Sequence, residues 1–269
     1  MNPVDFLAEK IYDSYGTINR CRFCYLYTAK GVRLTDMYQE GGRAILGWGG
    51  SSSYTVLKDV LSKGATGSFI TSHSFRLEKA VSTLFNSARK TFVFTEKKNA
   101  LQAALLVSSK GSSLWKPWND CDVNPAEIDC IIFEPPFASC EKLYILAVKE
   151  EVLDSEKSKL LEEFYSENKA YLSSALNAGV TRSVYNLIKA LQERSEKDWF
   201  RYDTVLCKYW ERKGPYLYPK VSKEKYTDFM LHCLSLGYVI SPVYEKPSIV
   251  PYSCDEGVFN ALKKNPFQE

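Results

Sequence analysis

The chain has 269 residues, of which 45% are hydrophobic and 25% are charged, as in an ordinary folded globular protein. Its 35 basic and 32 acidic side chains leave a net charge of +3, which is too balanced to indicate binding to nucleic acid. No run of 18 apolar residues occurs, so the sequence predicts no membrane span. This length suits one large domain or two smaller ones.

The cysteines bear on where the protein works. The start, MNPVDFLAEKIYDSYG, has early charges and no apolar signal core, so we expect a cytoplasmic protein. Its eight cysteines are then expected to be reduced thiols. Cys21 and Cys24 form a lone CxxC with no second pair, and the chain has only two histidines. This favours two thiols in a strand over a redox or metal site, and we predict no metal site.

The first elements predicted are a helix over 3–13 and a β-hairpin over 22–36. Aromatic residues alternate along the first strand of the hairpin, and a turn at Gly31 leads into the return strand. Alternation puts successive side chains on opposite faces, so we expect Cys21 and Cys24 on opposite faces of that strand. The glycine- and serine-rich stretch 41–53 is predicted to be a loop.

Strands and helices alternate through the middle of the chain. Apolar spacing predicts helices over 53–63, after Ser74 and from about residue 97, and strands over 91–94, 128–133 and 143–148. Pro135 and Pro136 separate the last two strands. This alternation predicts an α/β domain.

The rest of the chain is predicted to be mostly helical. The expected elements are helices over 155–177, 181–211 and 223–236, a strand over 238–243, a proline-rich strand or loop over 247–253 and a last helix from Asp255. Gly214 and Gly237 are expected to end the second and third of these helices. Helices packed on a small sheet would form an α+β domain.

Three stretches, in order along the chain, are similar to one family. They are YLYTAKGVRLTDMYQEGGRAILGWG, RLEKAVSTLFNSARKTFVFTEKKNALQAALLV and KYTDFMLHCLSLGYVISPVYEKPSIVPYSCDEGVFNALK. Together they resemble the opening hairpin, the phosphate-binding region and the C-terminal end of the class III aminotransferases. These are pyridoxal-phosphate-dependent transferases of fold type I and include glutamate semialdehyde aminomutase.

The resemblance implies a domain organisation. We expect residues 1–50 to pack on the C-terminal domain, 51–154 to form a reduced α/β large domain, and 155–269 to form a small α+β domain. Family members are longer, and the missing length falls in the middle of the large domain. The family is dimeric, so a homodimer is possible.

The resemblance places a phosphate-binding turn between the strand 91–94 and the next helix. A glycine of the family's turn is absent, and the candidate ligands here are Thr95, Lys97 and Asn99. Helix starts bind anions through free backbone N–H groups, but Glu96 would repel a phosphate. A solvated helix start is therefore the favoured interpretation. In the glycine-rich loop, Arg43 is a candidate contact for an anionic substrate, although a surface arginine on the loop is the favoured interpretation.

The family's Schiff-base lysine has no match. Either Glu134 or Pro135 stands near its position, or the lysine segment is deleted; Lys142 and Lys149 are nearby but do not fit the motif. Pyridoxal-phosphate chemistry needs that lysine and an acid at the pyridine nitrogen. We therefore predict a pseudoenzyme that has no catalytic residues and no cofactor, and that binds a protein partner or a small ligand. The alternative is an active pyridoxal-phosphate enzyme with a relocated lysine.

Overall fold

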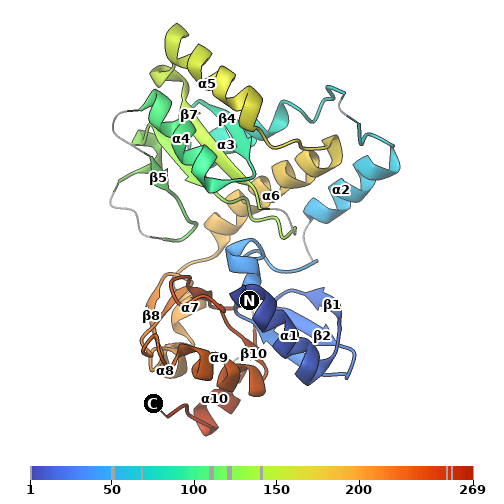
Figure 1. Cartoon of the computed structure of the whole chain (residues 1–269), viewed down its shortest axis with the longest axis vertical. Helices are drawn as coiled ribbons and strands as arrows, with labels where there is room; N and C mark the ends of the chain where they lie inside the picture. The colour runs from blue at the N-terminus through green and yellow to red at the C-terminus, as the bar shows by residue number, and fades with distance from the viewer. Residues whose placement is uncertain are drawn as a thin grey trace. The chain divides into compact units, whose positions relative to one another are not determined.

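The computed structural model describes residues 2–49, 52–67, 69–108, 112–119, 123–139, 142–252, 254–255 and 257–268 (Figure 1). The chain divides into two compact units. The central unit is Ser51–Gln192, and the terminal unit joins Met1–Gly50 to Glu193–Glu269.

The central unit is built on a four-stranded mixed sheet. Its strands are β4 (Arg89–Phe94), β5 (Ser113–Leu114), β6 (Cys130–Phe133) and β7 (Tyr144–Lys149), in the order β4-β7-β6-β5. β7 runs antiparallel to both of its neighbours, and β5 runs parallel to β6. The carboxyl ends of β4, β5 and β6 therefore meet at one edge of the sheet, which we call the carboxyl edge.

Helices cover both faces of this sheet. Leu77, Ala80 and Val81 of α3 (Arg76–Leu84) and Val180 and Val184 of α6 (Ser174–Glu193) pack on one face. Alanines of α4 (Lys97–Val107) and Leu161 of α5 (Ser155–Asn168) pack on the other. Side chains alternate along the strands, so Val93 faces the first layer while Phe92 and Phe94 face the second. A further helix, α2 (Ser52–Ser62), packs on α6 through Val60. This is the α/β arrangement that the sequence predicts.

The terminal unit contains two small sheets. The first, in the order β1-β2-β3-β10, consists of β1 (Ile18–Arg22), β2 (Tyr25–Thr28), β3 (Arg33–Asp36) and β10 (Tyr238–Val239). The second, in the order β11-β9-β8, consists of β8 (Trp210–Lys213), β9 (Tyr216–Pro219) and β11 (Ser248–Ile249). Because β10 pairs in parallel with β3, the two ends of the chain share one sheet.

Helices complete the terminal unit: α1 (Pro3–Tyr15), α7 (Lys197–Phe200), α8 (Asp203–Leu206), α9 (Tyr226–Ser235) and α10 (Asn260–Lys264). Among the described residues, short 3-10 turns occur within each unit: η1 (Gln39–Gly42) in the terminal unit, and η2 (Pro125–Glu127) and η3 (Glu150–Val152) in the central unit. The hydroxyl of Tyr15 at the end of α1 donates a 2.7 Å hydrogen bond to the carbonyl of Leu234 in α9, which ties the two helices together.

Two predictions about the C-terminal half differ from the structure. The expected boundary near residue 154 lies instead at residues 192 and 193, because α5 and α6 bury their apolar faces on the central sheet. The helix expected over 181–211 ends at Glu193, and α7, α8 and β8 follow. Gly214, with φ +55°, makes the turn of the β8–β9 hairpin and does not end a helix.

The predicted N-terminal hairpin is confirmed from Tyr25 to Asp36. β2 and β3 pair antiparallel, with Tyr25 opposite Thr35. The strand expected to run through Phe23 is broken there, because Phe23 has φ +53° and forms the turn between β1 and β2. Cys21 therefore lies in β1 and Cys24 lies in the turn before β2, so the prediction that the two thiols lie on opposite faces of one strand is wrong. The predicted loop 41–53 runs through residues 50 and 51, which lie outside the described residues.

Candidate functional site

The joint between β4 and α4 is exposed. Thr95 and Lys97 are exposed and Asn99 is half-buried. Glu96 is the N-cap of α4, and its side chain makes no capping hydrogen bond. A carboxylate at this place is favourable to the helix dipole but opposes an incoming phosphate. The three predicted phosphate ligands thus share one solvated helix start.

The lysines proposed as relocated catalytic groups lie far apart on the central sheet. Lys142 is exposed and precedes the start of β7, at the carboxyl edge where Phe94 pairs with Tyr144. Lys149 pairs with Arg89 at the opposite edge. Only Lys142 therefore shares an edge with the start of α4.

A further lysine at the carboxyl edge, Lys169, was not identified from the sequence. The backbone of Lys169 bridges to Phe94, and its ammonium lies 5.4 Å from the centre of the Tyr171 ring. Lys169 is exposed, and it follows α5 in a part of the chain with no motif that would single it out. Glu134, Pro135 and Pro136 follow β6 at the same edge.

The buried polar groups of the central unit do not fit pyridoxal phosphate. Within its described residues, the buried polar or charged side chains are those of Ser53, Arg89, Ser108, Ser174, Thr181 and Ser183. None of these is a carboxylate that could pair with a pyridinium nitrogen. The described carboxyl edge also offers no glycine turn for the phosphate. We therefore derive no chemistry through this cofactor.

The one buried charge among these residues, Arg89, has a structural role. Its guanidinium donates to the carbonyls of Pro125, Ile128, Asp129 and Ala147 at 2.7 to 3.3 Å. Its Nε donates to the hydroxyl of Ser87 at 2.8 Å. These bonds join the start of β4 to the turn before β6, at the edge away from α4.

Arg43 is buried in the terminal unit, with only 5% of its surface exposed. Its guanidinium donates 2.9 Å and 3.2 Å hydrogen bonds to the side chain and the backbone carbonyl of Glu40. The loop it stabilises is unusual, because four consecutive residues, 39–42, have positive φ. The predicted anion contact thus has an internal carboxylate as its partner.

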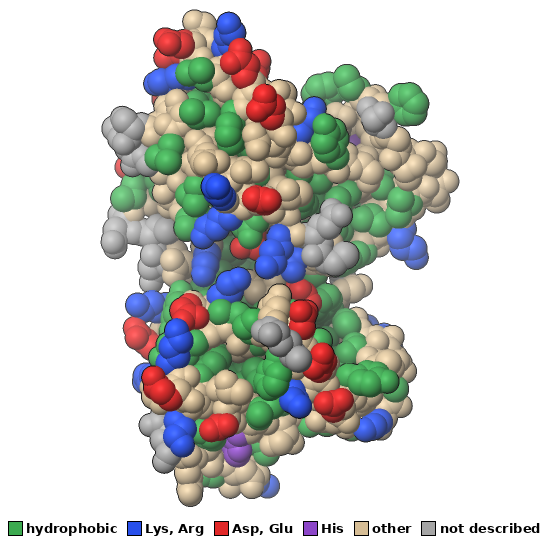
Figure 2. All heavy atoms as spheres, in the orientation of Figure 1, with side chains coloured by type: hydrophobic (Ala, Val, Ile, Leu, Met, Phe, Trp, Pro, Cys, Tyr) green, Lys and Arg blue, Asp and Glu red, His purple; other side chains and the backbone are tan. Residues whose placement is uncertain are grey.

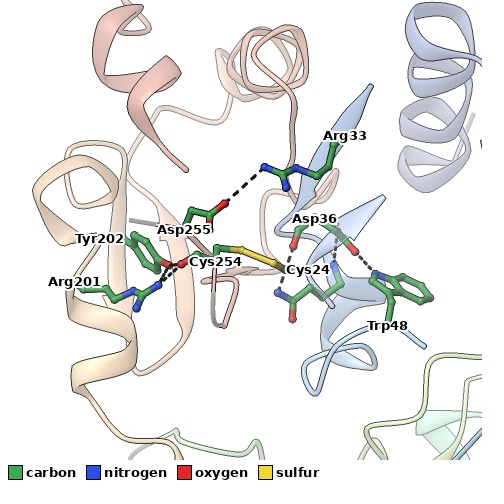
Figure 3. The surroundings of a disulfide bond; sticks show 9 residues. Cys24, Arg33, Asp36, Trp48, Arg201, Tyr202, Cys254 and Asp255 are labelled. Atoms are coloured by element: carbon green, nitrogen blue, oxygen red, sulfur yellow. Dashed lines mark hydrogen bonds and ion pairs between the residues drawn. A yellow bond between two sulfur atoms is a disulfide. The ribbon is translucent and has the colours of Figure 1, made fainter. Parts of the chain in front are cut away.

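Asp36 is the most unusual ionisable group of the terminal unit. It is 2% exposed, and its Oδ1 accepts hydrogen bonds from the backbone N–H groups of Tyr38 and Gln39 at 2.9 and 2.8 Å. Its Oδ2 accepts a 2.6 Å bond from the indole Nε1 of Trp48 (Figure 3). Burial raises the pKa of Asp36 to about 6, although these bonds act in the opposite direction.

A disulfide joins Cys24 to Cys254, which corrects the prediction of reduced thiols for these two residues (Figure 3). Their 230-residue separation explains why no local pattern revealed the pair. Both cysteines are buried, and the carbonyl of Cys254 accepts a 2.7 Å hydrogen bond from the Tyr202 hydroxyl and a bond from Arg201. Nearby, Arg33 pairs with Asp255 at 3.7 Å. The backbone N–H of Asp36 donates to the Cys24 carbonyl at 2.8 Å, so the disulfide and Asp36 belong to one cluster.

Sequence reasoning did not identify this cluster, although one signal was present. Asp36 lies two residues after the buried Leu34, so strand alternation puts it on the buried face of β3. Among the residues that the structure describes, no group of three or more His, Cys, Asp or Glu side chains could hold a metal ion. No helix in the described part of the chain has the length and hydropathy to cross a membrane.

No family model matches the sequence. The chain is 26% identical over 282 residues to an uncharacterized protein of Treponema pallidum (strain Nichols), covering 90% of this chain and 91% of that protein. It is 24% identical over 263 residues to an uncharacterized protein of Borreliella burgdorferi, covering 94% of this chain and 91% of that protein.

Solved structures show the fold. The ornithine aminotransferase of Toxoplasma gondii matches with a TM-score of 0.66 at 9% identity, covering 98% of this chain and 94% of that one. The glutamate-1-semialdehyde aminomutase of Pseudomonas aeruginosa matches with a TM-score of 0.62 at 8% identity, covering 92% of this chain and 85% of that one. The chain therefore has the mixed α/β fold of pyridoxal-phosphate-dependent aminotransferases, as the resemblance implied.

Proposed function

We propose that this protein is a non-catalytic relative of the class III aminotransferases that binds a small ligand. The observation that supports this is the carboxyl edge of the central sheet. There the start of α4 bears the exposed carboxylate of Glu96, and β6 leads into Glu134 and two prolines. Proline has no backbone N–H to offer an anion.

The alternative, an active enzyme with a relocated lysine, has a specific candidate. Lys142 stands at the carboxyl edge, as does Lys169, whereas Lys149 stands at the opposite edge. A nucleophilic lysine needs a lowered pKa, which comes from burial or from a cationic neighbour. Lys142 and Lys169 are both exposed, which supports the non-catalytic proposal.

The test is covalent labelling. The protein is incubated with pyridoxal phosphate, reduced with borohydride and mapped by peptide mass spectrometry. We expect substoichiometric label scattered over surface lysines. One lysine labelled near one equivalent, and lost from the map in Lys142→Arg or Lys169→Arg, would replace this proposal with the active-enzyme alternative. Arginine keeps the positive charge but forms no such adduct, so each variant is a matched control.

A further inference from the structure

A cavity of about 380 Å³ lies between α1 and the first sheet of the terminal unit. We call it the α1 pocket. Its walls are mainly apolar or aromatic and include Leu7, Ile11, Tyr12, Leu26, Tyr38 and Trp48. A largely apolar cavity with a few converging polar groups is the usual form of a small-molecule site, and this volume lies in the usual range.

The charges that line the α1 pocket are both negative. Asp36 and Glu40 border it, and no lysine, arginine or histidine does. Arg43 neutralises Glu40 at 2.9 Å. Among the ion pairs of the described residues, none includes Asp36, and the charged neighbour acting most on Asp36 is Glu40, a second carboxylate. Asp36 is therefore a buried carboxylate without a cationic partner.

A simpler role for Asp36 is to hold the turn that follows β3. The two backbone N–H groups and the Trp48 indole that it binds serve that role. These donors are neutral, however, and leave the negative charge of the carboxylate uncompensated. A buried charge without a partner is strongly unfavourable, and a cation supplied by a ligand would remove the penalty.

Cys21 also lines the pocket and is half-buried, but it does not supply a charge. Burial raises the pKa of its thiol, and the carboxylates of Asp36 and Glu40 raise it further, so Cys21 is a neutral thiol at physiological pH. Trp48, Tyr38 and Tyr12 also line the pocket, and aromatic rings attract cations. The volume of the pocket, its two carboxylates and its aromatic rings all favour a small organic cation as the ligand.

We propose that the α1 pocket binds a small organic amine, with its ammonium group directed at Asp36 and its apolar body along α1. This gives the small ligand of the proposed function a site and a chemical class. It rests on the terminal unit alone, so labelling of the central lysines tests the non-catalytic role separately.

The experiment uses three indoles that differ in charge: tryptamine is cationic, tryptophol is neutral and indole-3-propionate is anionic. Each is titrated into the full-length protein at neutral pH, and binding is followed by calorimetry and by the ¹H–¹⁵N signal of the Trp48 indole. We expect tryptamine to bind at least tenfold more tightly than tryptophol, since a charge-assisted hydrogen bond contributes about one to two powers of ten. Indole-3-propionate should bind most weakly.

Two variants locate the site. Asp36→Asn should remove the preference for tryptamine over tryptophol, and the exposed acid of α1, Asp13→Asn, should leave it unchanged. Asp36→Asn also alters the bond to Trp48, so Ala8→Trp provides a second route. Ala8 is exposed on α1 at the cavity, and a tryptophan there should block all three indoles without disturbing the core.

Equal binding of tryptamine and tryptophol would overturn the proposal, as would tryptamine binding that survives Ala8→Trp. Absence of binding by all three probes up to about 1 mM would also overturn it, since an affinity weaker than that corresponds to less than about 4 kcal/mol.

Discussion

The two units differ in where their charged side chains are exposed and where they are buried. In the central unit, the carboxyl edge, where α/β sheets usually bind ligands, carries exposed residues, among them Thr95, Lys97 and Lys142. In the terminal unit, Asp36 and Arg43 are buried and Arg194 is half-buried. Arg194 donates to the Ile45 carbonyl at 2.9 Å and lies 3.8 Å from the centre of the Tyr252 ring.

Among the described residues, the buried charges thus lie away from the carboxyl edge: Arg89 is at the opposite edge of the central sheet, and Asp36 and Arg43 are in the terminal unit. A buried charge is unfavourable unless it is paired, so its presence needs a structural or a functional reason. The carboxyl edge carries no such group among its described residues. On the face of the terminal unit that Figure 2 shows, acidic and basic side chains are intermingled with apolar ones.

The largest expected effect concerns Arg89, the one buried charge among the described residues of the central unit. Arg89→Met should destabilise that unit by about 3 kcal/mol or more, because several buried carbonyls lose their donor at once. Urea denaturation followed by fluorescence measures this. The control is Arg76→Met, an exposed arginine at the start of α3. Equal stability of the two variants would show that Arg89 does not hold β4 to the η2 turn.

In the terminal unit, the disulfide should contribute next. Cys24→Ser is expected to lower the free energy of unfolding by about 2–4 kcal/mol under non-reducing conditions. Cys21→Ser, three residues away and outside the bond, is the matched control. A reducing agent should bring the original protein to the level of Cys24→Ser. If the reducing agent has no effect and mass spectrometry finds two more free thiols than expected, the bond does not form.

Because Trp48 donates a hydrogen bond to Asp36, we expect the stability lost on removing the Trp48 indole to depend on pH. The pKa of Asp36 in the folded chain, about 6, lies above its ordinary value of 3.8. The stability that the protonated Asp36 side chain contributes to the fold is therefore fully present below about pH 4 and is lost as the pH rises through 6. Trp48→Phe removes a bond that favours the carboxylate and raises this pKa further. The variant should therefore lose about 1.5–3 kcal/mol at about pH 8 and less at about pH 4.5.

Urea denaturation of Trp48→Phe at the two pH values measures this difference. Two other ionisable groups interact electrostatically with Asp36. They are Glu40, which is paired with Arg43, and Cys21. Trp115→Phe in the central unit is the control for loss of an indole. A loss of stability that is the same at both pH values would mean that the Trp48 bond does not act through the Asp36 charge.

The smallest effect is expected at the start of α4. Glu96 is an N-cap without a capping hydrogen bond, so Glu96→Ser should raise stability by about 0.5 kcal/mol. The same variant removes the charge that opposes phosphate. If this variant also bound pyridoxal phosphate stoichiometrically, Glu96 would be the residue that prevents the carboxyl edge from binding the cofactor.

Much of the local structure could be predicted from sequence. The apolar runs 128–133 and 143–148 are strands because buried strands need apolar side chains on both faces. Gly237, with φ +86°, follows α9 at the predicted place. The break at Phe23 could not be predicted, because a non-glycine residue with positive φ is held there by long-range contacts, including hydrogen bonds with Trp48.

The candidate site was predicted less well. Thr95, Lys97 and Asn99 were located by resemblance, and the structure puts them at one exposed helix start. Asp36 and Cys254 were not identified, since nothing local separates a buried aspartate from a solvated one or pairs one cysteine with another 230 residues away.

By itself the sequence determined the apolar periodicities of the central strands and helices, and that an α/β core forms in the middle of the chain. Local sterics and apolar spacing decide these. Only the tertiary structure decided that α5 and α6 belong to the central unit, that Cys24 meets Cys254 and that Asp36 is buried without a cation. These depend on which surfaces far apart in the chain exclude water from each other, and that is a property of the packed fold.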